Sequence, residues 1–178
     1  MNKILYAFAL AGVLGLSSCS DFLDQNSPSE MTAENTYASP YYTNLRVNKL
    51  YGGMAQDRTY AQDLSIVWNL NSDCELIDGL GSNATNTSSE RGNMNYNMDP
   101  GWSKISGVWD AEYGIIEDAN QIIEGIRSSA TLTAGGANQK SMERSLGEAL
   151  TIRAMVYFDL VRIFGDIPFK VEASKSDL

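Results

Sequence analysis

Cys19 is the residue with the most specific chemistry in this 178-residue chain, because its thiol ends a short apolar segment. Residues 4–16, ILYAFALAGVLGL, follow Lys3 and lead into Ser17-Ser18-Cys19. Thirteen helical residues extend about 20 Å, short of the roughly 30 Å core of a bilayer, so this segment fits a signal peptide rather than a membrane-spanning helix. Leu16-Ser17-Ser18-Cys19 matches a lipobox, which predicts cleavage before Cys19 and a lipid on its thiol. The alternative is an ordinary secretory leader that happens to end near a cysteine.

Removal of residues 1–18 would leave 160 residues and move the formal net charge from −9 to −10, because Lys3 is lost. Such an acidic surface argues against nucleic acid and anionic lipid headgroups as partners. A lipidated Cys19 would leave Cys74 alone, so no disulfide is expected within one mature chain. The sequence contains no histidine, which excludes Ser–His and Cys–His nucleophiles and histidine metal sites. We expect no metal and no cofactor.

A polar segment over residues 79–101, GLGSNATNTSSERGNMNYNMDPG, carries the groups that could recognise a ligand. Its richness in Gly, Asn, Ser and Thr predicts a long surface loop, and such loops in compact domains are functional or disordered. Sugar recognition requires aromatic faces together with amides or guanidinium groups for the hydroxyls. The candidate ligand-binding residues in and beside this loop are Arg91, Asn95, Tyr96 and Trp102, with Asn93 and Asn97 beside them. The alternatives are solvated loop residues and, for Trp102, a core aromatic that begins a helix.

Asp73 and Glu75 are the pair of carboxylates to weigh for catalysis, since a glycosidase places two carboxyl groups around the scissile bond. Asp73 and Glu75 are two positions apart, and neither a helix nor a strand guarantees that side chains at this spacing flank a bond. We therefore predict no enzyme activity, with a surface glycosidase as the weakest hypothesis.

The elements that would position these residues are helical. Apolar residues recur at three- and four-residue spacing in four segments, residues 40–56, 62–78, 101–128 and 138–164. Ser39 and Pro40 suit a helix start, and Gly165 with Pro168 suits a helix end. No segment alternates with period two, so the expected fold class is all-α.

More specific expectations follow for the faces of these helices. In the first helix, Tyr41, Leu45, Asn48 and Tyr51 should share a face, with Val47, Leu50 and Met54 beside it. Trp68, Trp109 and Tyr113 are expected in the core. Ala154, Phe158 and Val161 have the small–large–small spacing of a tetratricopeptide repeat. Residues 19–38 are expected to form a lipidated tether, and residues 39–178 the helical domain.

Two long blocks of the sequence resemble the SusD/RagB family. They are Trp109-x3-Tyr113-x2-Ile116-x2-Ala119-Asn120-x-Ile122-Ile123 and Gly147-Glu148-Ala149-x3-Arg153-Ala154-x2-Tyr157-Phe158-x-Leu160-Val161-x2-Phe164-Gly165-Asp166-Ile167-Pro168. The segment Cys19-Ser20-Asp21-Phe22-Leu23-Asp24 is similar to the family's mature N-terminus. The resemblance extends over essentially the whole chain.

The resemblance implies a surface-exposed outer-membrane lipoprotein that binds glycans, or in some branches peptides, without catalysis. It implies a SusC-like TonB-dependent transporter as partner in nutrient uptake, and a scaffold of tetratricopeptide-like helix pairs. It also implies that the loop before the Trp109-x3-Tyr113 helix forms part of the glycan site. The alternative from another class is a helical-repeat adaptor that binds only protein. Whether the ligand is starch, another polysaccharide or a peptide is left open.

The chain would cover only the N-terminal part of such a protein, because members of this family continue well beyond the Gly165-Asp166-Ile167-Pro168 block. Stacked helical repeats bury their apolar faces against neighbouring repeats. We therefore expect an incomplete domain with marginal stability on its own.

Overall fold

The computed structural model describes residues 31–69, 72 and 100–174. The chain divides into two units, Met1–Thr32 and Ala33–Leu178, and the second contains every helix described here. The elements are α3 (Ala33–Ala38), α4 (Pro40–Met54), α5 (Asp63–Asn69), α7 (Ser103–Ser128), the 3₁₀ helix η2 (Ala130–Thr133) and α8 (Gly136–Phe164). All regular structure in the described residues is helical, which confirms the all-α prediction.

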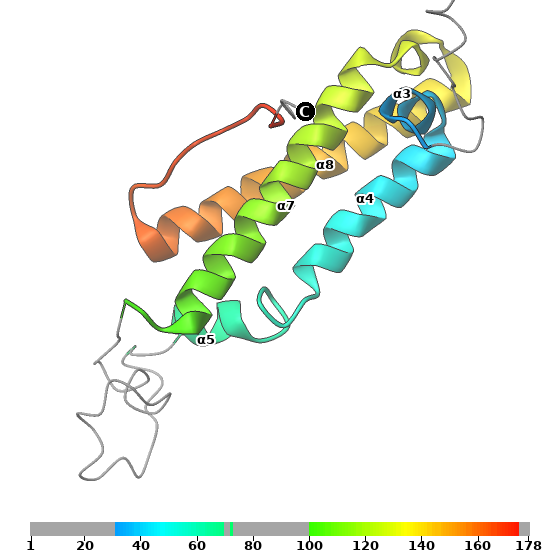
Figure 1. Ribbon diagram of the computed structural model, residues 1–178. Coiled ribbons are helices and arrows are strands. Elements are labelled where there is room, and N and C mark those ends of the chain that lie inside the picture. Colours follow the sequence, from blue (N-terminus) through cyan, green and yellow to red (C-terminus); the bar gives the residue numbers. More distant parts are fainter. Residues whose placement is uncertain (1–30, 70–71, 73–99, 175–178) are drawn as a thin grey trace, which may run out of the picture. The chain divides into compact units, whose positions relative to one another are not determined.

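Three long helices form the body of this unit. Helices α7 and α8 are joined through η2 and run antiparallel along each other, and α4 packs against both (Figure 1). Helix α5 lies at the end where α7 begins, while α3 lies at the opposite end beside η2 (Figure 1). The predicted ligand loop would therefore leave and re-enter this body at its α5 end.

The core follows the apolar stripe of α7, as its spacing predicts. Side chains at three- and four-residue intervals are at most 4% exposed: Ile115, Ile116, Ala119, Ile122, Ile123 and Ile126. They pack with Val47 and Leu50 of α4 and with Met142 and Leu160 of α8. Trp109 and Tyr113 are half-buried against this core, and the Trp109 ring meets Phe164 edge-on at 5.0 Å. Their core assignment is confirmed.

Two helix ends occur where the sequence predicts them. Helix α4 begins at Pro40 with Ser39 as N-cap. Helix α8 ends at Phe164, and Gly165 follows with a φ of 75°, a backbone region that favours glycine. The Gly165 N–H donates to the Val161 carbonyl at 3.0 Å. The chain then leaves the helix toward Pro168.

The buried face of α4 is the one that carries Val47 and Leu50. The structure buries Thr43, Val47 and Leu50, whereas Tyr41 is 68% exposed and Leu45 48% exposed, so the face that Tyr41 and Leu45 share lies toward solvent. The polar Thr43 is accommodated because its hydroxyl donates to the Thr36 carbonyl at 3.3 Å. A polar residue thus occupies the buried stripe, which a pattern based on apolar residues alone does not predict.

The tryptophan of helix α5 is not in the core, contrary to expectation. The helix spans Asp63–Asn69, Trp68 is 36% exposed, and most of the rest of the predicted segment 62–78 lies outside the described residues. The Arg162 guanidinium lies 4.1 Å from the centre of the Trp68 ring, a cation–π contact that offsets exposure of the ring.

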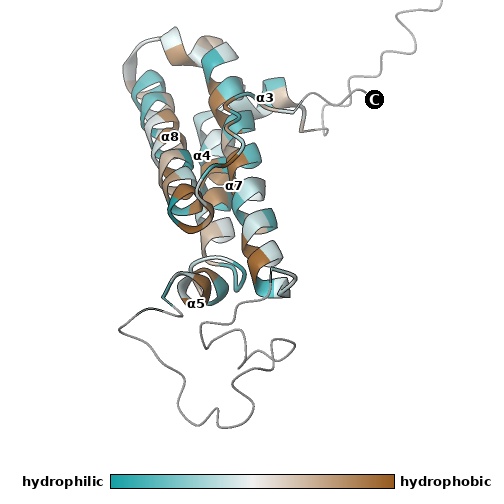
Figure 2. Ribbon diagram, turned by 90° about the vertical axis from the view of Figure 1, so that its left-hand side faces the viewer, coloured by the Kyte–Doolittle hydropathy of each residue, from teal (hydrophilic) through white to brown (hydrophobic). Residues whose placement is uncertain are grey.

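The face of α8 with the tetratricopeptide-like spacing is open in the described structure. Ala154, Phe158 and Val161 are all exposed, Phe158 at 58%. They line a groove of about 540 Å³ together with Phe169, and Figure 2 shows hydrophobic residues along the last turns of α8. These positions are therefore not part of the core that the described helices form.

Residues 33–38, within the segment expected to be a tether, form helix α3. Tyr37 is 7% exposed and belongs to the main core. The Ser129 hydroxyl donates to the Tyr37 carbonyl at 2.6 Å, and the Thr131 hydroxyl to the Ala38 carbonyl at 2.9 Å. The packed part of the chain therefore begins at Ala33. Among the described helices, none is long and apolar enough to cross a membrane.

Candidate functional site

Most predicted site residues lie outside the described residues. These are Cys19, Arg91, Asn95 and Tyr96, and the same holds for Asp73, Cys74 and Glu75. Trp102 is described, as are the elements on either side of residues 70–99. The structure thus shows how the two ends of the predicted ligand loop are held.

Trp102 holds the C-terminal end of that loop. It is 7% exposed and packs in an apolar cluster with Leu64, Val67 and Val108. Its carbonyl accepts the Ile105 N–H at 3.0 Å, so its backbone begins α7. This position favours the core alternative for Trp102, and contact of its ring with a ligand stays a prediction.

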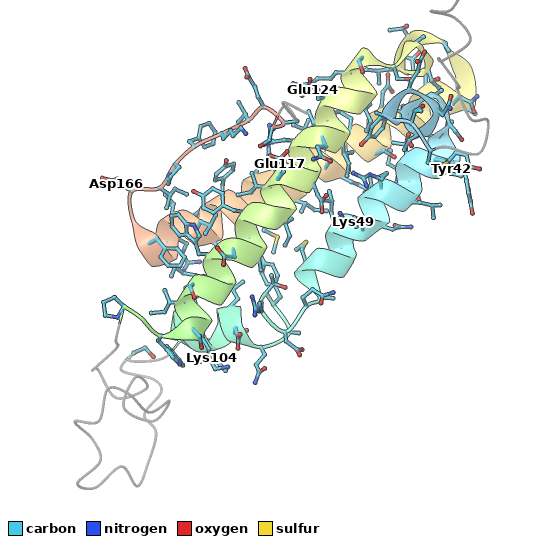
Figure 3. All side chains as sticks on the ribbon, viewed as in Figure 1. Tyr42, Lys49, Lys104, Glu117, Glu124 and Asp166 are labelled. Atoms are coloured by element: carbon cyan, nitrogen blue, oxygen red, sulfur yellow. The ribbon has the colours of Figure 1, made fainter. Side chains whose placement is uncertain are left out.

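Helix α5 is the last described element before residues 70–99, which include most of the predicted loop. The Lys104 ammonium of α7 lies 2.8 Å from the Asp63 carboxylate in the first turn of α5, with both side chains less than one fifth exposed. Figure 3 shows Lys104 at the end of α7 that meets α5. A partly buried ion pair is screened less by solvent than a surface pair. The two elements that flank residues 70–99 are therefore fastened to each other.

Trp68 is the exposed aromatic that sequence reasoning missed at this end of the molecule. It lies one residue before the end of α5, and Arg162 of α8 lies between its ring and that of Phe158, 5.2 Å from the latter. The sequence offered little signal, because the predicted segment 62–78 placed Trp68 well before its end.

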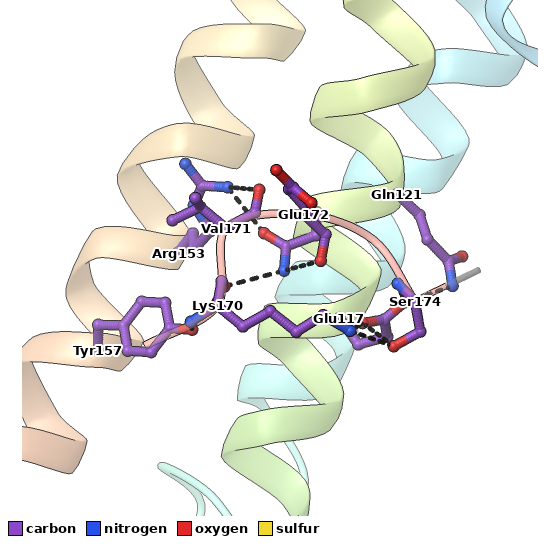
Figure 4. Close-up of polar contacts among 9 residues, drawn as sticks. Glu117, Gln121, Arg153, Tyr157, Lys170, Val171, Glu172 and Ser174 are labelled. Atoms are coloured by element: carbon purple, nitrogen blue, oxygen red, sulfur yellow. Dashed lines mark hydrogen bonds and ion pairs between the residues drawn. The ribbon is translucent and has the colours of Figure 1, made fainter. Parts of the chain in front are cut away.

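A second group of polar side chains holds the chain after α8 as an extended strap, residues 168–174. The Asn120 side chain, 1% exposed, donates from Nδ2 to the carbonyls of Lys170 and Glu172 at 3.1 and 3.2 Å. The Arg153 guanidinium donates to Asn120 Oδ1 at 2.7 Å and to the Val171 carbonyl at 3.1 Å. Figure 4 shows these bonds between α7, α8 and the strap.

Three further side chains hold the strap, those of Tyr113, Glu117 and Tyr157. Together with Asn120 and Arg153 we call them the clasp. The Tyr157 hydroxyl donates to the Lys170 carbonyl at 2.7 Å and accepts the Lys170 N–H at 2.9 Å. The Tyr113 hydroxyl donates to the Pro168 carbonyl at 2.7 Å. Glu117 accepts the Ser174 N–H at 2.8 Å, and hydrogen bonds from Ser174 and Gln121 together with Lys170 lower the pKa of Glu117 against the opposing effect of burial.

The clasp explains why polar residues occur at fixed positions within the two sequence blocks. Tyr113, Asn120, Arg153 and Tyr157 all bind backbone groups of the strap, which needs no particular side chains in return. This arrangement positions a chain segment and contains no pair of carboxylates facing a cleft. In the described part of the chain, no three His, Cys, Asp or Glu residues lie close enough together to hold a metal ion.

Comparisons with known proteins agree with this architecture. A solved structure of a SusD homologue from Bacteroides thetaiotaomicron superposes with a TM-score of 0.63 at 24% identity, over 72% of this chain and 23% of that one. This similarity concerns the fold alone.

Curated relatives give the same family in sequence. Two SusD-like proteins from Formosa agariphila are 29% and 23% identical to the chain over 95% and 96% of its length. A SusD-like protein from Bacteroides ovatus is 30% identical over 63 residues. The chain spans 31% of the length of either Formosa relative. A family model described as SusD-like, starch-binding and associating with the outer membrane matches residues 21–178. The chain therefore belongs to the SusD-like family.

Proposed function

We propose that the protein is a surface-exposed outer-membrane lipoprotein that binds a glycan without catalysis and works with a SusC-like TonB-dependent transporter. The observation that carries the proposal is the family match over residues 21–178, which begins just behind Cys19. The lipobox ending in Cys19 supports the lipid anchor. In this proposal Cys19 carries the lipid, and the protein delivers bound oligosaccharide to the transporter.

We place the glycan contacts in the loop that contains Arg91, Asn95 and Tyr96, with Trp102 at its end. The support is the composition of the loop, together with the packing of the described chain on either side of residues 70–99 through Trp102 and the Asp63–Lys104 pair. Fixing the chain on both sides of a loop lowers the entropy lost when it orders around a ligand. Trp68 lies in the last turn of α5, before residues 70–99, and is exposed enough to offer part of its ring.

Tyr96→Ala is expected to weaken binding of starch-derived oligosaccharides at least about fivefold, because loss of one aromatic contact costs about 1 kcal/mol. Isothermal titration of the purified chain measures this. Tyr51→Ala is the matched control, since Tyr51 is an exposed tyrosine on α4, and it should bind as the wild type does. Equal weakening by both variants, or binding of peptides in place of glycans, would contradict the proposed site or ligand class. Release of reducing ends would instead support a glycosidase.

Cys19→Ala is expected to abolish incorporation of labelled fatty acid and to move the protein from the membrane fraction to the soluble fraction. Stable anchoring depends on the acyl chains attached at that residue. Cys74→Ala supplies the control, because Cys74 is the second of the two cysteines in the sequence, and it should retain label and membrane association. Label retained by the Cys19 variant would exclude the lipobox assignment.

A further inference from the structure

Glu112 is a carboxylic acid buried in the middle of α7. Its side chain is 0% exposed, and neither carboxylate oxygen has a hydrogen-bond partner among the described residues. A buried ionised carboxylate without a partner is costly, and proteins avoid this cost by keeping the group neutral. Neither the clasp nor the predicted ligand loop uses this residue.

Two titratable groups share the burial site with Glu112. Asp159 of α8 is 3% exposed and accepts a short hydrogen bond from the hydroxyl of Tyr60, which lies between α4 and α5. Burial first, and then the Asp159 charge, raise the pKa of Glu112 to about 8. Burial and the bond to Asp159 also raise the pKa of Tyr60.

Two basic side chains lie on this side of α7. Lys104 pairs with Asp63 at 2.8 Å, and the Arg58 side chain lies 3.5 Å from the position of a Cβ at Gly107, one and a half turns before Glu112. Neither contributes to the pKa of Glu112. An ionised Glu112 would therefore face a second carboxylate without a compensating cation.

This buried acid lies near the connection between α4 and α5, because its charge is among the causes that raise the pKa of Tyr60. The fully buried Thr59 hydroxyl lies 2.7 Å from the Met54 carbonyl at the end of α4, and the Leu64 N–H donates to the Thr59 carbonyl at 3.0 Å. The neighbouring Tyr60 joins the same connection to α8 through Asp159. Repulsion between Glu112 and Asp159 would separate α7 from α8 where Tyr60 closes the junction.

We propose that Glu112 is a proton-dependent lock: protonated, it allows α7, α8 and the α4–α5 connection to pack together, and its ionisation loosens α5. The consequence is a loss of stability with rising pH. An acid whose pKa is about 4.5 when unfolded and about 8 when folded makes the unfolding equilibrium constant rise about tenfold per pH unit between those values. Protonated Glu112 contributes its full stabilisation below about pH 4.5, and this contribution is lost by about pH 8.

No histidine titrates between pH 5 and 8, because the sequence contains none. Glu117, with its lowered pKa, acts in the opposite direction and at acidic pH, since its contribution is lost as pH falls through its folded pKa. A slope between pH 5 and 8 therefore reports mainly on Glu112.

Urea unfolding of the purified chain from pH 5 to 9, followed by tryptophan fluorescence, tests the lock. We expect the tenfold-per-unit rise in the wild type and in Glu124→Gln, because Glu124 is an exposed glutamate on the same helix. Glu112→Gln and Glu112→Met should remove the rise. A wild type with no slope, or Glu112 variants that keep it, would overturn the proposal.

Two measurements keep the test decisive if the variants fold poorly. Carbon-detected NMR of the Glu112 carboxyl in the wild type should give a midpoint near pH 8, and a midpoint below 6 would refute the lock. Hydrogen exchange, corrected for intrinsic rates, should show amides of α5 and residues 55–62 gaining exchange at pH 9 before those of η2. Equal gains in exchange near α5 and near η2 would show that ionisation of Glu112 does not loosen α5 in particular.

Discussion

Gly125→Ala is expected to destabilise the chain by about 1–3 kcal/mol, the range for overpacking a filled core. A Cβ at position 125 would lie 2.2 Å from two carbons of the Tyr37 ring, so the ring must move. Tyr37 is 7% exposed and its backbone is held by Ser129. The result should be release of α3 from α7 and η2, measured as a lower urea midpoint and faster hydrogen exchange of residues 33–38.

Gly114→Ala on the same helix is the matched control. Apart from the backbone of its own helix, no described atom lies within 4 Å of a Cβ at that position, and alanine favours a helix over glycine by up to about 1 kcal/mol. This variant should be slightly more stable than the wild type. A Tyr37→Ala background should abolish the cost of Gly125→Ala, because the clash is with that ring. A Gly125→Ala protein as stable as Gly114→Ala would contradict the packing described here.

Asn120→Ala is expected to cost about 2–3 kcal/mol and to free the strap. The substitution removes two donors to strap carbonyls and the acceptor of the Arg153 guanidinium at once. Buried polar groups that lose a partner cost about 1–3 kcal/mol each to leave unsatisfied. Strap residues reach solvent once released, which limits the total. Trypsin cleavage after Lys170, followed by mass spectrometry, should be markedly faster in the variant.

Asn48→Ala provides the comparison for this variant. Asn48 is exposed on α4, and its amide bonds only to the side chain of Asn44 one turn earlier among the described contacts. Its stability and cleavage at Lys170 should match the wild type within about 0.5 kcal/mol. Unchanged cleavage in Asn120→Ala would mean that Tyr113 and Tyr157 hold the strap without the asparagine.

The long helices could be predicted because local pattern and burial agree in them. The isoleucines of α7 recur on one face, and this face is the core. Gly165 ends α8 as expected, because a positive φ is a property of one residue and its neighbours.

Other features depend on partners distant in sequence. Thr43 is buried because Thr36 accepts its hydroxyl, and Trp68 stays at the surface with Arg162 of another helix. Helix α3 has few apolar residues, and the ring of its Tyr37 packs against Gly125, 88 positions later in the sequence. The spacing of apolar residues does not predict the clasp either, because its side chains bind backbone groups of the strap. Of the candidate ligand residues, Trp102 is described, and its burial reflects an apolar cluster assembled from two helices.

The packing of α3 also limits the reach of the proposed lipid anchor. If Cys19 carries the lipid, the chain between Cys19 and the first packed residue, Ala33, can span at most about 50 Å, against about 70 Å if the packed part began at residue 39. A shorter span raises the local concentration of a tethered protein near any partner in the same membrane. Under that proposal, the contact between Gly125 and the Tyr37 ring would help set the largest distance between the helices and the lipid.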